Sequence, residues 1–286
     1  MQILSTPLFF EGGCAVALGT FDGVHIGHSE VVKKATAFNL PVVVVTTFSS
    51  PHNSKRILSH TLCQDRFKAL GVDYVLYLDF ENIKNISPTH YLDFLRQKLN
   101  AVSFCCGYNF KFGKNASGDK DTVISYAEKN GLNYSIAENV EDASSTLIRK
   151  LLNLGEIEKA NKLLGHNYCF DFEVVSGDKR GRTWDFPTIN QPFDENFCIP
   201  KFGVYVSKTY IDGNEYKSVT NIGIRPTYKL KNAISETHII DFDGNLYGKK
   251  IKVELLHFIR DEIKFDTQAD IIQQIKIDTE FSKNYK

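Results

Sequence analysis

Two histidines stand three residues apart in the segment 19–28 (GTFDGVHIGH). The apolar residues 15–18 before it predict a buried strand, and residues 29–35 after it have helical spacing. His25 and His28 are therefore expected where a strand gives way to a helix, beside glycines that let a ligand approach the backbone. A helix N-terminus attracts anions, and imidazoles there can bind a phosphate and follow its charge during a reaction. The alternative, a turn that carries two surface histidines, stays open at this point.

The elements that must position these histidines alternate in type along the first half of the chain. Residues 40–48 are rich in β-branched side chains, which is typical of a parallel strand covered on both faces. Further strands are predicted at 74–78, 103–107 and 134–136, with helices at 63–70, 91–99 and 121–129. This alternation predicts an open, mostly parallel α/β sheet. Ligands of such sheets bind beyond the carboxyl ends of the strands, which is where the two histidines fall.

The pattern changes after two helices predicted at 144–154 and 156–164, the second of which ends at Gly165. Short strands are then predicted at 170–175, 203–210, 216–223, 236–241 and 250–258, followed by a helix at 267–281. Short strands at near-regular spacing, separated by turn residues, predict an antiparallel barrel. We therefore expect two domains, residues 1–166 and residues 167–286, which suits a chain of 286 residues.

Composition excludes several classes of protein. Lys and Arg together number 34, as do Asp and Glu, so the formal net charge is zero. This balance argues against binding nucleic acid or an anionic membrane through bulk charge. The six cysteines form no C-x-x-C pair and no zinc-finger spacing, which favours buried thiols. With no signal-peptide pattern and no apolar run of about 18 residues, the chain is predicted to be cytoplasmic.

The segment 19–28 resembles the first signature of the bacterial bifunctional riboflavin kinase/FAD synthetases, within the wider H-x-G-H nucleotidyltransferase superfamily. Residues 107–119 (GYNFKFGKNASGD) and 144–149 (SSTLIR) match later signatures of that family closely and in the same order. Residues 47–52 (TFSSPH) match a further one, although Asn53 replaces its second proline. The resemblance implies a Rossmann-like domain that transfers AMP from ATP to FMN, giving FAD and pyrophosphate.

The resemblance also implies the residues of the adenylyltransferase site. Its catalytic residues would be His25 and His28, which hold the phosphates and the developing charge, and Arg149, which supplies a permanent bidentate positive charge. The implied ATP-binding set is Gly19, Phe21, His25, His28, Ser145, Thr146 and Arg149, and the implied FMN-binding pair is Asp22 and Asn109. Taken alone, residues 144–149 are typical of a capped helix with a surface arginine, and Asn109 is typical of a turn. Four matching segments in one order argue against coincidence.

The second half resembles a riboflavin kinase, which implies an antiparallel β-barrel that converts riboflavin and ATP into FMN. Residues 177–190 (GDKRGRTWDFPTIN) match the kinase signature, and residues 199–205, 221–228, 236–248 and 260–266 match further family segments. No Walker A motif occurs, so the glycine-rich turn would cradle the phosphates with its backbone amides.

The kinase resemblance implies its own site residues. ATP would be bound by Gly177, Gly181, Thr188 and Asn190, Mg²⁺ by Thr188 and Asn190, and the flavin by Glu236, Arg225 and Arg260. Glu236 would be the catalytic base, which accepts the proton of the flavin 5′-hydroxyl as that hydroxyl attacks the γ-phosphorus of ATP. Taken alone, Glu236 is typical of a solvated strand carboxylate. Its place in the E-T-H-I segment favours the catalytic role.

One departure from the family concerns Trp184 and Asp185, which stand where a small or aliphatic residue and a glycine are usual. Asp185 is expected to bring a negative charge close to the ATP phosphates. Two rival functions remain: an enzyme that keeps only one of the two activities, and a flavin-responsive binding module without catalysis. The complete sets of site residues favour a bifunctional enzyme. Its expected ligands are riboflavin, FMN, FAD, ATP and Mg²⁺, with no nucleic acid and no membrane.

Overall fold

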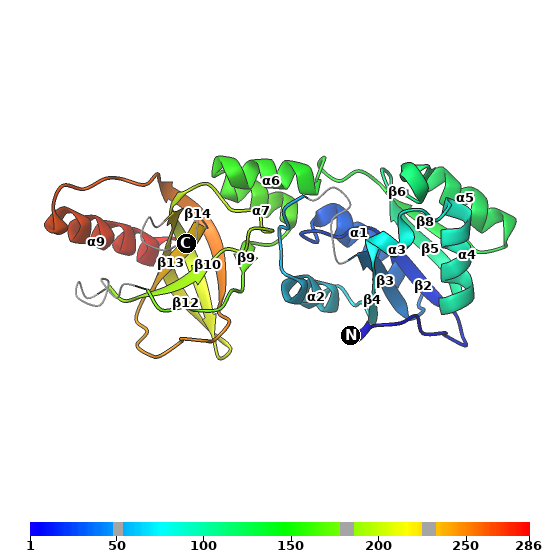
Figure 1. Cartoon of the computed structure of the whole chain (residues 1–286), viewed down its shortest axis with the longest axis horizontal. Helices are drawn as coiled ribbons and strands as arrows, with labels where there is room; N and C mark the ends of the chain where they lie inside the picture. The colour runs from blue at the N-terminus through cyan, green and yellow to red at the C-terminus, as the bar shows by residue number, and fades with distance from the viewer. Residues whose placement is uncertain (48–53, 178–185, 225–232) are drawn as a thin grey trace. The chain divides into compact units, whose positions relative to one another are not determined.

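The structure, a computed structural model, describes residues 1–47, 54–177, 186–224 and 233–286 (Figure 1). The chain forms two compact units, one of Met1–Ser54 with His60–Ser145 and one of Lys55–Ser59 with Thr146–Lys286. Helices α6 (Ser145–Leu154) and α7 (Ile157–Leu164) thus belong almost entirely to the second unit. The two compact units meet in the sequence between Ser145 and Thr146. The domain boundary expected after residue 166 stays a prediction.

The first unit is built on a parallel six-stranded sheet in the order β1-β4-β3-β2-β5-β8. Its strands are β1 (Gln2–Leu4), β2 (Cys14–Leu18), β3 (Val42–Thr47), β4 (Tyr74–Leu78), β5 (Ala101–Gly107) and β8 (Asn133–Ala137). The chain leaves β2 for β3 on one side and returns later to β5 on the other side. The carboxyl end of β2 therefore lies at the switch point of the topology, where such sheets bind their ligands.

Helices cover both faces of this sheet, which explains the continuous apolar runs of its central strands. All five residues of β2 and the first five of β3 are buried. On one face, α4 (Pro88–Leu99) and α5 (Lys120–Lys129) pack over a core that includes Val16, Val43 and Phe104. Figure 1 shows α1 (Ile26–Thr36) on the opposite face, where it contacts β2, β5 and β8. The unit also contains α2 (His60–Ala69), α3 (Phe80–Ile83), η1 (Lys114–Ala116) and a hairpin of β6 (Lys111–Phe112) and β7 (Gly118–Asp119).

The second unit is an antiparallel sheet that curls on itself. Its order is β10-β13-β12-β11-β14-β9. The strands are β9 (Tyr168–Phe170), β10 (Thr188–Pro192), β11 (Gly203–Ile211), β12 (Asn214–Ile224), β13 (Ala233–Ile239) and β14 (Lys252–Arg260). Beyond β9, the chain forms one bridge from Glu173 to Lys250 and another from Val175 to Asn190 of β10. These bridges join the two edges of the sheet, so the predicted antiparallel barrel is confirmed, as is the parallel α/β sheet.

One face of the curled sheet carries a network of buried hydroxyl groups. The side chains of Ser207, Thr209, Ser218, Thr220 and Thr237 are fully buried and hydrogen-bond one another at 2.7–2.9 Å. Buried polar groups cost little when they are paired in this way. Because side chains alternate along a strand, the residues between these hydroxyls point to the other face of the sheet. Glu236 precedes Thr237 in β13, so it lies on that other face, together with Asn190 and Thr188 of the paired strand β10.

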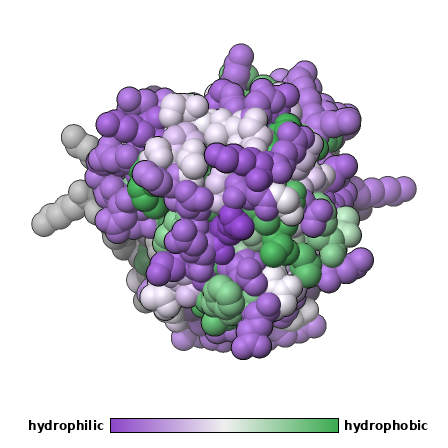
Figure 2. All heavy atoms as spheres, turned by 90° about the vertical axis from the view of Figure 1, so that its right-hand side faces the viewer, coloured by the Kyte–Doolittle hydropathy of each residue, from purple (hydrophilic) through white to green (hydrophobic). Residues whose placement is uncertain are grey.

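Helix α9 (Gln268–Asn284) of the second unit packs on β11 and β12. Thr267 caps its first turn, and the Ser282 hydroxyl near its end donates a hydrogen bond to the carbonyl of Ser218 at 2.8 Å. Among the described residues, no helix is long and apolar enough to cross a membrane. The face shown in Figure 2 is mainly hydrophilic, with hydrophobic residues confined to a few patches.

Candidate functional site

His25 forms the N-cap of α1, and its Nδ1 accepts a hydrogen bond from the backbone N–H of His28 at 3.3 Å. The two imidazole rings stack, with centroids 3.6 Å apart and planes 20° from parallel. Gly27 leaves room for this packing, because a Cβ there would lie only 3.1 Å from Cε1 of His25. His25 is 6% exposed, so the pair is not a surface turn. Both rings lie at the positive end of the helix dipole.

His28 is held as a neutral ring. Burial, and secondarily the nearby His25, lowers the pKa of His28 well below its usual value. Its Nδ1 is buried and has no hydrogen-bond partner among the described residues. The ring of Phe21 contacts His28 at 5.1 Å between centroids and packs edge-on against Phe67 at 5.5 Å. A phosphate at this position would supply both a hydrogen-bond partner and the negative charge that favours protonation of the ring.

The loop between β2 and α1 is held in an unusual conformation. Val24 has a φ of 41°, in a region that β-branched residues rarely adopt. The Thr46 hydroxyl at the end of β3 donates a hydrogen bond to the carbonyl of Thr20 at 2.9 Å. The Ser145 hydroxyl donates to the carbonyl of Asp22 at the same distance. These two bonds tie the loop to a neighbouring strand and to the start of α6, which fixes the histidines in place.

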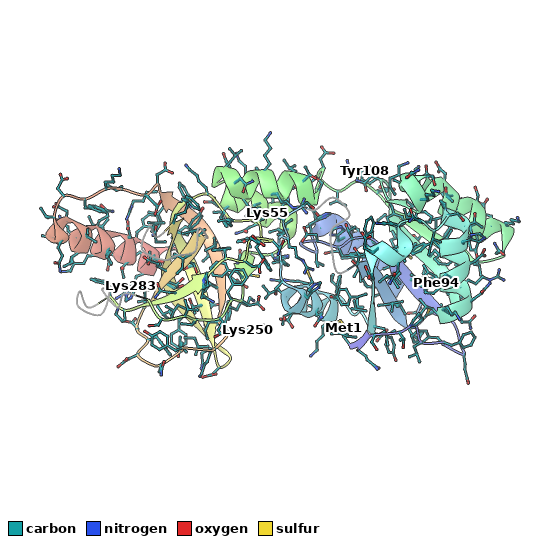
Figure 3. The ribbon with its side chains drawn as sticks, in the orientation of Figure 1. Met1, Lys55, Phe94, Tyr108, Lys250 and Lys283 are labelled. Atoms are coloured by element: carbon teal, nitrogen blue, oxygen red, sulfur yellow. The ribbon has the colours of Figure 1, made fainter. Side chains whose placement is uncertain are left out.

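Asn109 comes to the same edge of the sheet as the histidine loop. It follows β5, which pairs directly with β2 so that Leu18 lies opposite Cys106. Asn109 is exposed, and its neighbour Tyr108, labelled in Figure 3, is 42% exposed. The structure therefore places an open amide beyond one strand end and the stacked imidazoles beyond the adjacent one.

Two of the predicted adenylyltransferase residues, Thr146 and Arg149, belong to the second unit. The Nε of Arg149 donates a hydrogen bond to the carbonyl of Lys55 at 2.6 Å, and Lys55 is labelled in Figure 3. The other members of the predicted set lie in the first unit: Gly19, Phe21, Asp22, His25, His28, Asn109 and Ser145. The histidines, Phe21 and Ser145 are linked there by the ring contacts and loop hydrogen bonds described above.

In the second unit, the register of two neighbouring strands brings the predicted kinase residues together. Asn190 of β10 lies directly opposite Glu236 of β13, and Thr188 lies opposite His238. Directly opposed residues point to the same face of a sheet, as do residues two apart on one strand. Thr188, Asn190 and Glu236 therefore form one cluster of oxygen-bearing side chains.

The carboxamide of Asn190 is tightly enclosed. Asn190 is 4% exposed, and its Oδ1 is buried without a hydrogen-bond partner in the described parts of the chain. Gly177 packs against it so closely that a Cβ there would lie 2.6 Å from Nδ2 of Asn190. Because a buried carbonyl oxygen is costly to leave unpaired, this oxygen is suited to a ligand. Amide and hydroxyl oxygens suit Mg²⁺, which completes its shell with phosphate oxygens and water.

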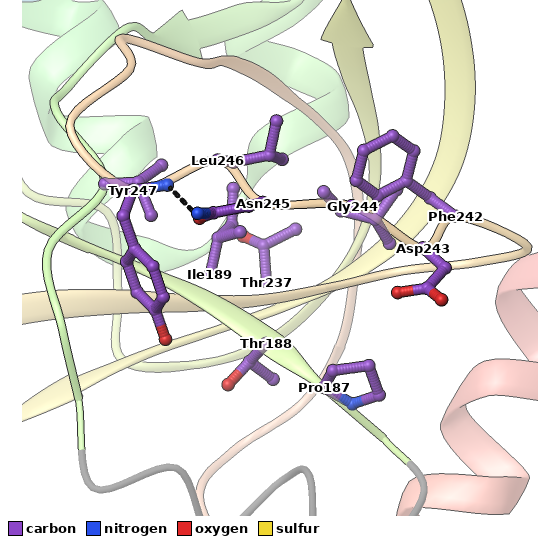
Figure 4. Close-up of a pocket in the computed structure, with 12 residues that line it drawn as sticks. Pro187, Thr188, Ile189, Thr237, Phe242, Asp243, Gly244, Asn245, Leu246 and Tyr247 are labelled. Atoms are coloured by element: carbon purple, nitrogen blue, oxygen red, sulfur yellow. Dashed lines mark hydrogen bonds between the residues drawn. The ribbon is translucent and has the colours of Figure 1, made fainter.

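A pocket of about 670 Å³ opens beside Thr188 (Figure 4). It is lined by Val174, Pro187, Thr188, Ile189, Thr237, Ile239 and residues 242–247. Figure 4 shows Thr188 and Pro187 on one side and the loop of Asn245, Leu246 and Tyr247 on the other. The Oδ1 of Asn245 accepts a hydrogen bond from the backbone N–H of Tyr247 at 3.1 Å, which holds that loop. Aliphatic and aromatic walls with a few polar groups are typical of pockets for flat organic ligands.

Arg260 ends β14 in an ion pair with α9. Its Nε and Nη2 donate to the carboxylate of Asp278, the closest pair being 2.6 Å apart. The side chain of Asp278 is 4% exposed and that of Arg260 is 20% exposed. A flavin-binding role for Arg260 stays a prediction, since the described contacts of its guanidinium are to Asp278 and to the carbonyl of Asp261. The predicted site residues Gly181 and Arg225 lie outside the described residues, as do Trp184 and Asp185.

Three structurally important side chains carried no signal of their own in the sequence. Thr46 is one of several β-branched residues in its strand, and Asp278 is one of several acidic residues in α9. His238 lies within the E-T-H-I segment, which predicts a functional role only for Glu236. Each of the three acts through a partner distant in the chain, which residue spacing does not reveal.

Comparisons with known proteins match both units. The family model described as FAD synthetase matches residues 10–150, and the model described as riboflavin kinase matches residues 164–286. A bifunctional riboflavin kinase/FMN adenylyltransferase of Listeria monocytogenes is 32% identical over 94% of this chain and 91% of its own. A protein of the same description from Haemophilus influenzae is 32% identical over 96% of this chain and 94% of its own.

A solved structure also resembles the whole chain. It comes from Streptococcus pneumoniae, is described as a macrolide-efflux protein, and is 28% identical. The likeness covers 99% of both chains with a TM-score of 0.88. This similarity supports the fold of both units. The description as an efflux protein applies to the Streptococcus pneumoniae protein.

Proposed function

Because the chain belongs to the family of bifunctional riboflavin kinase/FMN adenylyltransferases, we propose how its two sites divide the two activities of that family. The chain phosphorylates riboflavin with ATP to give FMN, and it adenylylates FMN with ATP to give FAD and pyrophosphate. The match of both family models, in order, carries this conclusion over the rival of an enzyme with a single activity. It also argues against a binding module without catalysis.

The adenylyltransferase site is formed around the histidine loop of the first unit. His25 and His28 bind the ATP phosphates at the N-terminus of α1, and the neutral His28 takes up positive charge as negative charge develops. Ser145, Thr146 and Arg149 provide further donors to the triphosphate, and Gly19 and Phe21 line the nucleotide. Asn109 and Asp22 orient FMN, whose phosphate oxygen attacks the α-phosphorus and displaces pyrophosphate.

The kinase site is formed by β10 and β13 of the second unit. Glu236 accepts the proton of the riboflavin 5′-hydroxyl as the hydroxyl oxygen attacks the γ-phosphorus of ATP, and ADP leaves. The register that sets Asn190 opposite Glu236 supports this role, because it puts a phosphate-binding amide beside the base. Gly177 and Gly181 contribute backbone groups to the phosphates, and Arg225 and Arg260 contact the flavin.

The proposal includes a magnesium ion at the kinase site. Thr188 and Asn190 would hold the ion, and the buried Oδ1 of Asn190 supports the assignment. When bound, Mg²⁺ neutralises charge on the phosphates of ATP. These two residues position the phosphates with neutral oxygens, so they do not add to the negative charge of the nucleotide.

The pocket beside Thr188 is a candidate for the base of ATP. Thr188 is the one proposed ligand among its lining residues, and Phe242, Leu246 and Tyr247 offer apolar and aromatic surface to a flat ring. The cytoplasmic location, the lack of a nucleic-acid partner and the domain boundary after residue 166 stay predictions of the sequence.

The decisive experiment is product analysis after incubating the purified chain with riboflavin and Mg-ATP. Sequential appearance of FMN and FAD, with ADP and pyrophosphate as co-products, is expected. FMN alone would support a kinase without transferase activity. Binding of flavin without any product would support a binding module.

A further inference from the structure

His238 makes a contact that the proposed kinase mechanism does not use. Its Nδ1 lies 2.9 Å from the carbonyl oxygen of Pro187, which directly precedes Thr188. The ring of Phe186 meets the imidazole edge-on, with centroids 5.2 Å apart. One side chain of β13 therefore holds the two residues that lead into β10.

The chemistry of this contact fixes the state of the ring. A carbonyl oxygen only accepts hydrogen bonds, so Nδ1 of His238 must carry the proton. The edge-on Phe186 ring limits rotation of the imidazole. His238 is thus a fixed donor aimed at the Pro187 carbonyl.

The position of the contact in the sheet explains why it matters. The ladder between β10 and β13 begins at the pair of Thr188 and His238, so Thr188 lies at the end of the ladder. Ladder ends open more easily than ladder centres, and Pro187 has no N–H with which to extend the ladder. The hydrogen bond from His238 secures the residue just beyond the last pair.

We propose that His238 is a positioning residue of the riboflavin kinase reaction, which holds the Pro187–Thr188 peptide so that the Thr188 hydroxyl faces the ATP phosphates. This inference rests on the proposed kinase site. A small misplacement of a binding group is sufficient to reduce rate strongly. His238 itself does not touch the reacting atoms; it acts through Thr188.

The test compares two amide side chains at one position. Asn in H238N carries its N–H₂ close to the place of Nδ1, whereas Gln in H238Q carries it close to the place of Nε2. In both variants and in H238A, the KM for Mg-ATP, the KM for riboflavin and the kcat of FMN formation are measured. FAD formation from supplied FMN serves as the control, because its proposed site lies mainly in the other unit.

We expect kcat/KM for Mg-ATP to fall by roughly tenfold or more in H238A and H238Q, and to stay within about threefold of wild type in H238N. The KM for riboflavin should change little in all three. Equal losses in H238N and H238Q would overturn the inference, as would a change confined to riboflavin. If the wild-type chain forms no FMN, the proposed kinase function itself is wrong. That result is distinguishable from a failure of the inference about His238, in which the wild type forms FMN.

A double-variant comparison separates positioning from a general loss of stability. If His238 acts through Thr188, H238Q should reduce kcat/KM by less than about twofold when added to T188A. Additive losses would show that His238 acts independently of Thr188 and would overturn the inference. The midpoint of thermal unfolding is recorded for every variant, and equal midpoints for H238N and H238Q are expected.

Discussion

At the scale of single residues, both proposed sites present neutral side chains to the phosphates that they would bind. His28 is neutral because burial and His25 lower its pKa, and Asn190 presents a buried amide oxygen. Neutral groups avoid the cost of burying an unpaired charge before the ligand arrives. The imidazole can gain a proton when phosphate binds, so it responds to charge that develops during the reaction.

This use of His28 predicts a selective loss of one activity. His28→Ala should lower FAD formation from FMN by roughly 10²–10³-fold, the usual effect of removing one transition-state contact. FMN formation from riboflavin should remain close to that of the wild type. His90→Ala, at an exposed histidine of the same unit, is the matched control and should leave both rates unchanged. Equal loss of both activities in His28→Ala would contradict separate sites.

Glu236 gives the converse prediction. Glu236→Gln keeps the size of the side chain and removes the base, so riboflavin phosphorylation should fall by roughly 10²–10⁴-fold. FAD formation from supplied FMN should continue near the normal rate. Steady-state rates with each substrate measure both effects. Phosphorylation at the wild-type rate would show that another group accepts the proton.

At the scale of elements, patterns of apolar residues predicted most of the fold, and the exceptions have physical causes. The run at 40–48 corresponds to β3, and the capped segment at 144–154 corresponds to α6. A strand is predicted at 170–175, whereas β9 covers Tyr168–Phe170, and residues 171–175 make isolated bridges to Lys250 and Asn190. The sequence does not predict β10, because its five residues, Thr-Ile-Asn-Gln-Pro, are mostly polar. β10 forms through its pairing with β13, which lies more than 40 residues further along the chain.

The contribution of the ion pair between β14 and α9 can be measured directly. Asp278→Asn leaves the half-buried Arg260 without its partner, so the free energy of unfolding of the second unit should fall by about 3 kcal/mol. Lys283→Ala removes one partner of the exposed pair with Asp241, which is 3.9 Å long, and should cost less than about 1 kcal/mol. Urea unfolding followed by circular dichroism compares the two. Similar costs would show that burial does not strengthen the Arg260 pair.

At the scale of the whole molecule, the residues proposed for the kinase reaction all lie in one compact unit, whereas the stacked histidines lie in the other. Each unit therefore has its own core, and the histidine loop and the pair of Asn190 and Glu236 lie in different units. The product of the kinase reaction, FMN, is the substrate of the adenylyltransferase reaction. This relation allows the independence of the two activities to be tested with two variants, each of which lacks one activity.

An equimolar mixture of His28→Ala and Glu236→Gln should convert riboflavin into FAD, although neither variant does so alone at a comparable rate. The first variant supplies FMN to the solution, and the second adenylylates it, because each retains one intact site. A lag before FAD appears is expected while free FMN accumulates. If the mixture forms no FAD while each variant keeps its single activity, FMN does not pass between molecules and the two sites are coupled within one chain.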